Sequence, residues 1–317
     1  MTDRGAGISA RHRAFLLAGL VTVGGCAGLW SGPPALTDRP VELTDTAFFP
    51  QEAYQCGPAA LATVLDASGV PVHPDQLAPS VYLPERKGSL QVELMAAARR
   101  RGRLAVEVNG DLQTIVAQLQ AGRPVRVLQN LGVSFLPVWH YAVVVGYQPE
   151  RDRFVLRSGR ERRELTGRRR FQATWRRGGY WALVVTAPDA GPAGFVPRDY
   201  LAAAADLENT GAHHHALVAF STAREAWPEQ PLAFLGEANN LYYLGRHEAA
   251  ADAYRRLLEQ HPGHVVAVHN LAMLLLELNR PCQARAVVAA AAGLEGALMD
   301  TARRAVATAE PGSCPAG

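Results

Sequence analysis

Cysteine and unbalanced charge are both scarce in this sequence. Four cysteines occur in 317 residues, and the formal net charge of +3 is too small to indicate a nucleic-acid-binding protein. Two basic clusters, at residues 98–103 and 160–170, are interpreted as solvated surfaces, because runs of charge are usually exposed. The apolar fraction of 48% is typical of globular proteins, so a sizeable core is expected.

The N-terminal apolar run AFLLAGLVTVGG is too short to span a bilayer. It follows Arg11 and Arg13 and has the length of the apolar part of an export signal. The run ends at Cys26, and VGGC resembles a bacterial lipobox, whose cysteine is lipidated. We expect residues 1–25 to be a lipoprotein signal peptide, 26–45 to be a proline-bearing tether, and Cys26 to carry the lipid. An ordinary signal peptide with an incidental Cys26 is the alternative.

A lipid-anchored cysteine implies a location in the bacterial cell envelope. Two or more acyl chains would anchor the protein stably to a membrane, and Ala27 favours the outer membrane over retention in the inner one. The expected compartment is the periplasm, which is oxidising. Cys282 and Cys314 could form a disulfide there, although their spacing alone does not establish the pairing.

Residues 46–185 combine helical and strand patterns. Helical periodicity occurs first, in three segments that end at Gly69, Gly102 and Gly122. Four β-rich apolar runs follow, with the sequences PVRVLQN, HYAVVVGY, FVLRSG and WALVVTA. Helices followed by a mostly antiparallel sheet predict an α+β domain. Residues 186–196 are rich in Pro, Gly and Ala and are predicted to be a linker.

A period of 34 residues marks the C-terminal part of the chain. Small residues recur at Ala216, Ala250 and Ala284, and larger apolar ones at Phe220, Tyr254 and Val288. This spacing resembles the tetratricopeptide repeat, which implies an all-α domain over 197–295 that binds a protein partner in its groove. Residues 296–317 are expected to form a capping helix and tail. An irregular helical bundle is the alternative.

Three consecutive histidines, His213 to His215, raise the question of a metal site. Adjacent residues on a helix point in different directions, so the three side chains cannot easily surround one ion. A polar turn between two repeat helices is the favoured interpretation, and no metal is predicted.

Cys56 precedes Gly57 and Pro58 at the start of an apolar, alanine-rich helical segment. A helix N-terminus offers unpaired N–H groups and a partial positive charge, which favour a nucleophilic thiolate. Proline is tolerated in the first turn, and glycine leaves room beside the sulfur for a substrate carbonyl. A buried structural cysteine is the alternative.

Two further residues could complete a site for nucleophilic catalysis. Gln51 lies in the segment that enters the helix, where its side-chain amide could help the Cys56 N–H to bind an oxyanion. His140 begins an apolar strand, and an imidazole that faces a helix N-terminus can serve a cysteine nucleophile as base. A core or surface histidine is the alternative for His140.

Together these residues resemble the C39 peptidases, a papain-like family of leader-cleaving domains. The resemblance covers residues 46–185 and rests on Gln51, on CGPAAL from Cys56, on His140-Tyr141 followed by VVVG, and on the closing segment FQATWRRGGYWALVV. It implies a papain-like fold in which Cys56 is the nucleophile, His140 is the base and then the acid, and Gln51 is the oxyanion donor.

One position departs from the family pattern. The family usually places Asp before Pro at the end of the strand after the histidine strand, where it orients the imidazole. Ser158 stands nearest that position here, and Asp152 is expected in the preceding hairpin turn. A serine hydroxyl can accept a hydrogen bond from an imidazole N–H but brings no charge to stabilise imidazolium. Papain-like enzymes use a neutral Asn at this position, so catalysis remains feasible.

The predicted function is that of an envelope-anchored cysteine peptidase that cleaves peptides through a thioester. It needs no cofactor and no metal. Its predicted partners are a peptide or protein substrate, a protein bound to the repeats, and a membrane reached through Cys26. Two alternatives are an inactive peptidase-like scaffold that binds peptides, which Ser158 favours, and an acyltransferase in which an amine replaces water.

Overall fold

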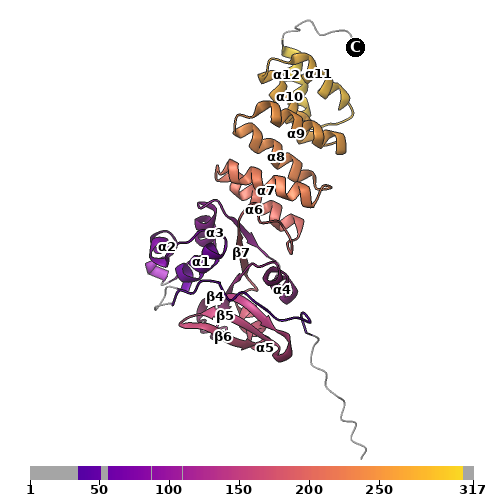
Figure 1. Ribbon diagram of the computed structural model, residues 1–317. Coiled ribbons are helices and arrows are strands. Elements are labelled where there is room, and N and C mark those ends of the chain that lie inside the picture. Colours follow the sequence, from indigo (N-terminus) through magenta and orange to yellow (C-terminus); the bar gives the residue numbers. More distant parts are fainter. Residues whose placement is uncertain (1–34, 51–55, 87, 109, 310–317) are drawn as a thin grey trace, which may run out of the picture. The chain divides into compact units, whose positions relative to one another are not determined.

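The computed structural model describes residues 35–50, 56–86, 88–108 and 110–309 (Figure 1). Gln51, Cys26 and Cys314 lie outside the described residues, together with the predicted signal peptide. The roles predicted for them, and the pairing of Cys282 with Cys314, therefore stay predictions.

An antiparallel sheet forms the centre of the N-terminal domain. In the described part of the chain it has seven strands, in the order β2-β7-β3-β4-β5-β6, and β1 pairs with β4. The strands are β1 (Val41–Glu42), β2 (Leu104–Glu107), β3 (Val125–Asn130), β4 (Trp139–Gln148), β5 (Arg153–Ser158), β6 (Glu161–Gly167) and β7 (Ala182–Thr186). The four predicted β-rich runs correspond to β3, β4, β5 and β7.

Helices pack on both faces of this sheet. They are α1 (Cys56–Ala67), α2 (Pro74–Val81), α3 (Gln91–Arg99), α4 (Leu112–Gln120) and α5 (Arg168–Arg177), with short 3₁₀ turns at Pro84–Arg86 and Pro149–Arg151. The three predicted helices are α1, α3 and α4. The glycines expected to end α1 and α3 adopt positive φ, +85° at Gly69 and +68° at Gly102, which is the conformation of a helix stop.

Side-chain alternation along the strands divides the core into two layers. One layer joins α1, α2 and α3 to Tyr141, Val143 and Val145 of β4. The other joins α4 and α5 to Ala142 and Val144 of the same strand. We call these faces the α1 side and the α5 side of the sheet.

The basic cluster at 160–170 forms a strand and the start of a helix, which its composition did not predict. Residues 161–167 form the edge strand β6, whose side chains are mostly exposed, as expected for a solvated surface. The cluster continues into α5, which buries Phe171 and Trp175 against the sheet. Because the apolar face of α5 is narrow, most of its positions are polar, and many of these are arginines.

The C-terminal region is all-helical, as predicted (Figure 1). Its helices are α6 (Pro197–Asn209), α7 (His213–Ala226), α8 (Pro231–Tyr243), α9 (His247–Gln260), α10 (Val265–Glu277), α11 (Pro281–Ala290) and α12 (Ala297–Thr308). The small residues at the 34-residue spacing are buried, with Ala216, Ala250 and Ala284 each 0% exposed. The segment expected to cap the repeats is α12.

The three consecutive histidines form the first turn of α7, not the turn before it. The rings of His214 and His215 lie edge to face, with centroids 6.0 Å apart. His213 Nδ1 lies 3.0 Å from Asn240 Oδ1, and its ring stacks on Tyr243. Within the described ranges no group of three or more His, Cys, Asp or Glu residues could hold a metal ion.

The segment predicted as a linker is packed against the first domain. Gln118 donates a hydrogen bond of 2.6 Å to the Gly194 carbonyl, and Arg123 donates to the Ala193 carbonyl. The α5-side core continues from β2 into Leu207 of α6 and Phe220 of α7. In the part of the chain that the structure covers, no helix is both long and apolar enough to cross a membrane.

Candidate active site

Cys56 is the first residue of α1 and lies on the α1 side of the sheet. Its thiol is free, it is partly exposed, and it packs against the core layer beneath α1. A cavity of about 710 Å³ opens beside it. Its other lining residues come from the segment before α3, from β3 and from the start of β4: Arg86, Gly88, Ser89, Leu90, Gln91, Leu128, Pro137, Val138, Trp139 and Tyr141.

Close packing positions the first turn of α1. Gly57 is buried, and a Cβ placed on it would lie 2.2 Å from Ser89 Oγ. Tyr141 donates a hydrogen bond of 3.1 Å to the Ser89 carbonyl from the other direction. Ser89 is therefore held between the helix and the sheet, where it lines the cavity together with Cys56.

His140 is the second residue of β4, as the sequence predicted, and its ring lies on the α5 side. Its Nε2 atom is 3.0 Å from Ser158 Oγ at the end of β5. Gln129, its partner on β3, donates a hydrogen bond to Thr174 of α5. Burial lowers the pKa of His140 below its ordinary value, and the nearby Glu164 opposes this shift.

Cys56 and His140 lie near the same end of β4 but on different sides of the sheet. Tyr141, the residue after His140, lines the cavity with Cys56, whereas His140 points toward Ser158 and Glu164. No hydrogen bond joins the Cys56 thiol to the imidazole, although both residues are described. The expected facing of helix N-terminus and imidazole is not present in this conformation.

The histidine has a neutral hydrogen-bond partner. Ser158 is 8% exposed, and it reaches the ring nitrogen at the place where the family pattern expects a carboxylate. Asp152 lies in the β4–β5 turn, with φ +48°, where it accepts a hydrogen bond from Tyr147 and pairs with Arg168. It is therefore engaged elsewhere, as its place in the turn suggested.

Arg126 is a residue of the site that sequence reasoning overlooked. It is 0% exposed on the α1 side of β3, and it donates a hydrogen bond of 3.3 Å to the Gly57 carbonyl. Its guanidinium carbon lies 4.0 Å from the centre of the Tyr141 ring. The signal was present in PVRVLQN, where a charge interrupts an apolar strand that is buried on both faces.

An exposed apolar loop forms one rim of the cavity. Residues 131–138 connect β3 to β4, and Asn130 Oδ1 accepts hydrogen bonds from the backbone N–H groups of Gly132 and Val138. Phe135 at its tip is 90% exposed. This loop is more apolar than an ordinary surface loop, which suits the binding of an apolar segment of a peptide.

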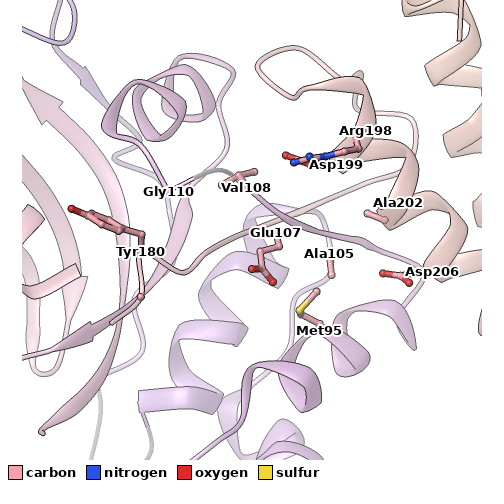
Figure 2. Close-up of a pocket in the computed structure, with 12 residues that line it drawn as sticks. Met95, Ala105, Glu107, Val108, Gly110, Tyr180, Arg198, Asp199, Ala202 and Asp206 are labelled. Atoms are coloured by element: carbon pink, nitrogen blue, oxygen red, sulfur yellow. Dashed lines mark hydrogen bonds and ion pairs between the residues drawn. The ribbon is translucent and has the colours of Figure 1, made fainter. Parts of the chain in front are cut away.

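A second cavity, of about 390 Å³, lies between the first domain and α6 (Figure 2). Glu107 and Tyr180 line it from the first domain, and Asp199 and Asp206 line it from α6. Its lining residues include no cysteine, serine or histidine, so it does not offer the cysteine chemistry expected at Cys56.

Comparison with known families identifies both regions. Residues 43–182 match the Peptidase_C39 like family, and residues 241–296 match a tetratricopeptide repeat. The chain thus carries a peptidase C39-like domain followed by tetratricopeptide repeats. The match to this family covers less than half of the chain and suggests a cysteine peptidase domain.

Two solved structures resemble part of the chain. A putative C39-like peptidase from Bacillus anthracis is 17% identical, with a TM-score of 0.40, over 47% of this chain and 98% of the other. The peptidase domain of Streptococcus ComA, a bifunctional ABC transporter involved in quorum sensing, is 21% identical, with a TM-score of 0.37, over 44% and 98%. No curated protein matches the chain significantly.

Proposed function

We propose that this protein is a cysteine peptidase in which Cys56 attacks the carbonyl of a bound peptide. The observation that carries the proposal is a free, partly exposed cysteine at a helix N-terminus, beside a cavity of about 710 Å³ within a C39-like domain. The size and the apolar lining of this cavity are those of a site for a peptide segment.

The proposed reaction has two steps. Thiolate Cys56 attacks the carbonyl carbon, and the resulting oxyanion is held by the Cys56 N–H and the Gln51 amide. Protonated His140 gives its proton to the leaving nitrogen as the C–N bond breaks, which leaves a thioester. Water then attacks the thioester, its proton passes to His140, and the C–S bond breaks to restore the thiolate.

Ser158 is the positioning residue in this scheme. Its contact with Nε2 leaves Nδ1 as the ring nitrogen that exchanges the proton. In this conformation His140 lies on the α5 side of the sheet. The proposed reaction therefore requires the imidazole to move around the end of β4, so that Nδ1 comes within reach of the substrate bound at Cys56. We propose that this movement accompanies the binding of a peptide along the loop of residues 131–138.

The test is incubation of the full chain with a mixed peptide library, with cleavage products read by mass spectrometry. We expect cleavage by the wild type, none by Cys56→Ala, and a loss of roughly 100-fold or more in His140→Ala. His214→Ala, which alters an exposed histidine of the repeats, is the matched control and should retain full activity. Equal cleavage by wild type and Cys56→Ala would refute the proposal.

A second candidate function is a non-catalytic peptide-binding scaffold. The neutral Ser158 and the separation of Cys56 from His140 favour it. In that case the wild type would bind library peptides without cleaving any, and Val138→Asp at the cavity would reduce binding. Turnover that depends on Cys56 would exclude the scaffold.

We also propose that the protein is anchored in the envelope by lipid on Cys26, facing the periplasm, and that its repeats bind a protein. Polar groups of α8, α9 and α10 form one network in the repeats, in which Tyr254 and Asn270 both donate to Asn239 Oδ1. Release of Cys26→Ser into the soluble fraction would support anchoring, and unchanged membrane association would refute it.

A further inference from the structure

Arg126 is a buried cation beneath the first turn of α1. Its side chain lies between that turn, the ring of Tyr141 and, at 5.9 Å, the ring of Trp181. Of its donors, Nη2 reaches the Gly57 carbonyl, whereas Nε and Nη1 are buried without a hydrogen-bond partner among the described residues. A buried charge is costly unless an opposite charge or several hydrogen bonds compensate it.

No carboxylate in the described part of the chain forms an ion pair with Arg126. The titratable groups that act on it are Tyr141 and Cys56. Burial raises the pKa of Tyr141, so its phenol stays neutral and donates to the Ser89 carbonyl. Burial also lowers the pKa of Arg126, to about 10, which leaves the guanidinium charged at neutral pH.

Among the described residues that act on Arg126, the remaining group that can carry the opposite charge is the Cys56 sulfur. It is one residue from the carbonyl that Arg126 holds, at the N-terminus of the same helix. Arg86 lines the cavity beside Cys56 and adds a second positive charge on the solvent side. His140 is on the α5 side, with a neutral hydroxyl as its partner.

We infer that Arg126 is the fixed counterion that keeps Cys56 in its thiolate form. Papain-like sites can hold the thiolate with an imidazolium, which disappears when the histidine loses its proton. A guanidinium keeps its proton well above the pH at which an imidazolium loses it. The thiolate of this protein therefore persists independently of the charge on His140, and Arg126 acts as a positioning and charge-balancing residue, not as one that touches the substrate.

The experiment measures the pH dependence of alkylation at Cys56. The full chain is treated with iodoacetamide between pH 5 and 10, and the rate is read from the Cys56 peptide by mass spectrometry, which separates it from the other cysteines. The variants are Arg126→Met, Arg126→Lys and His140→Ala. Arg123→Met, which removes another buried arginine on the other side of the sheet, is the matched control.

We expect the wild-type midpoint to lie well below that of a free thiol. An opposite charge at this range moves a titration midpoint by roughly 1–3 pH units, so Arg126→Met should slow alkylation at pH 6.5 by roughly 10-fold or more. Arg126→Lys should recover part of the rate. His140→Ala and Arg123→Met should leave the midpoint in place, and all variants should converge at the alkaline end of the range, where every thiol is ionised.

The inference is overturned if the alkylation midpoint of the wild type equals that of a free thiol. This comparison needs no variant, so the inference is tested even if Arg126→Met does not fold. A midpoint that moves in His140→Ala as far as in Arg126→Met also overturns it, because the imidazolium is then the counterion. The inference concerns the same thiol as the proposed function but is separable from it. Alkylation reports the thiolate, whereas peptide cleavage reports turnover.

Discussion

At the scale of single residues, the environment of His140 sets the expected pH dependence. Burial disfavours the charged imidazolium and lowers its pKa, and the neutral Ser158 supplies no charge to restore it. Since the proposed reaction uses protonated His140 as the acid, activity should decline as pH rises through the lowered pKa. The unfolded chain binds this proton at higher pH than the folded one, so His140 should also reduce the free energy of unfolding as pH falls below its ordinary value.

Ser158→Asp tests this residue-scale account. A carboxylate beside Nε2 should stabilise imidazolium and move the alkaline limb of kcat/KM upward by roughly 1–3 pH units. Activity at pH 7.5 should rise accordingly, by roughly 10-fold for each pH unit through which the limb moves. Ser158→Ala, which removes the hydrogen bond without adding charge, is the control and should not extend the limb. A profile that is the same for Ser158→Asp and the wild type would contradict the role given to His140.

At the scale of elements, the site depends on the close approach of α1 to the segment before α3. Gly57 has no side chain, and Ser89 occupies the space beside it. Ser89 is in turn tied to β4 by Tyr141. The helix that carries Cys56 is therefore positioned by contacts from two other elements and not by its own sequence alone.

Gly57→Ala tests this packing. Its Cβ would lie 2.2 Å from Ser89 Oγ, so α1 and the Ser89 segment must separate. We expect a loss of roughly 1–3 kcal/mol in the free energy of unfolding and slower peptide cleavage. Gly167→Ala is the control, because that glycine has φ −60° and no atom within 4 Å of an added Cβ. Equal stability of the two variants in urea denaturation would show that the Ser89 contact does not constrain α1.

At the scale of the whole described structure, the peptidase-like domain and the first repeat share a core. Leu207 of α6 lies in the same apolar layer as Leu104 and Val106 of β2. Arg99 of α3 pairs with Asp206 of α6. Helices α8 to α12 contribute to a separate layer around Leu271 and Leu274. The two layers adjoin at α7 and α8, where Phe220 and Ala233 belong to the first and Leu217 and Phe234 to the second.

Leu207→Ala should therefore destabilise the sheet as well as α6. Leu207 is 0% exposed, and Leu271, which is truncated in the control variant, is 1% exposed. Truncation of a buried leucine to alanine lowers the free energy of unfolding by about 2–5 kcal/mol. Hydrogen exchange of the β2 amides is the measurement, and it should accelerate in Leu207→Ala. Leu271→Ala in α10 is the matched control and should leave β2 exchange unchanged. Faster exchange in both variants, or in neither, would refute the shared core.

Much of the fold could be predicted from the sequence because its signals are local. Apolar β-rich runs predicted β3, β4, β5 and β7, glycine stops marked the ends of α1 and α3, and the 34-residue spacing identified the repeats. Strand β6 and helix α5 were missed, because most of their arginines face solvent and only Phe171 and Trp175 carry the apolar pattern of the helix. The composition of 186–196 indicated a linker, and its packing against Gln118 and Arg123 was not visible.

The sequence by itself determined which groups are available: a cysteine at the start of a helix, a histidine at the start of a strand, and a serine where a carboxylate is usual. Only the tertiary structure decided which of them meet. Adjacent residues of a strand face opposite sides of a sheet, so Tyr141 joins Cys56 while His140 joins Ser158. The same alternation places Arg126, whose neighbours in sequence are apolar, beneath the first turn of the helix that carries the thiol. Such proximity depends on strand register and helix packing, which no local pattern encodes.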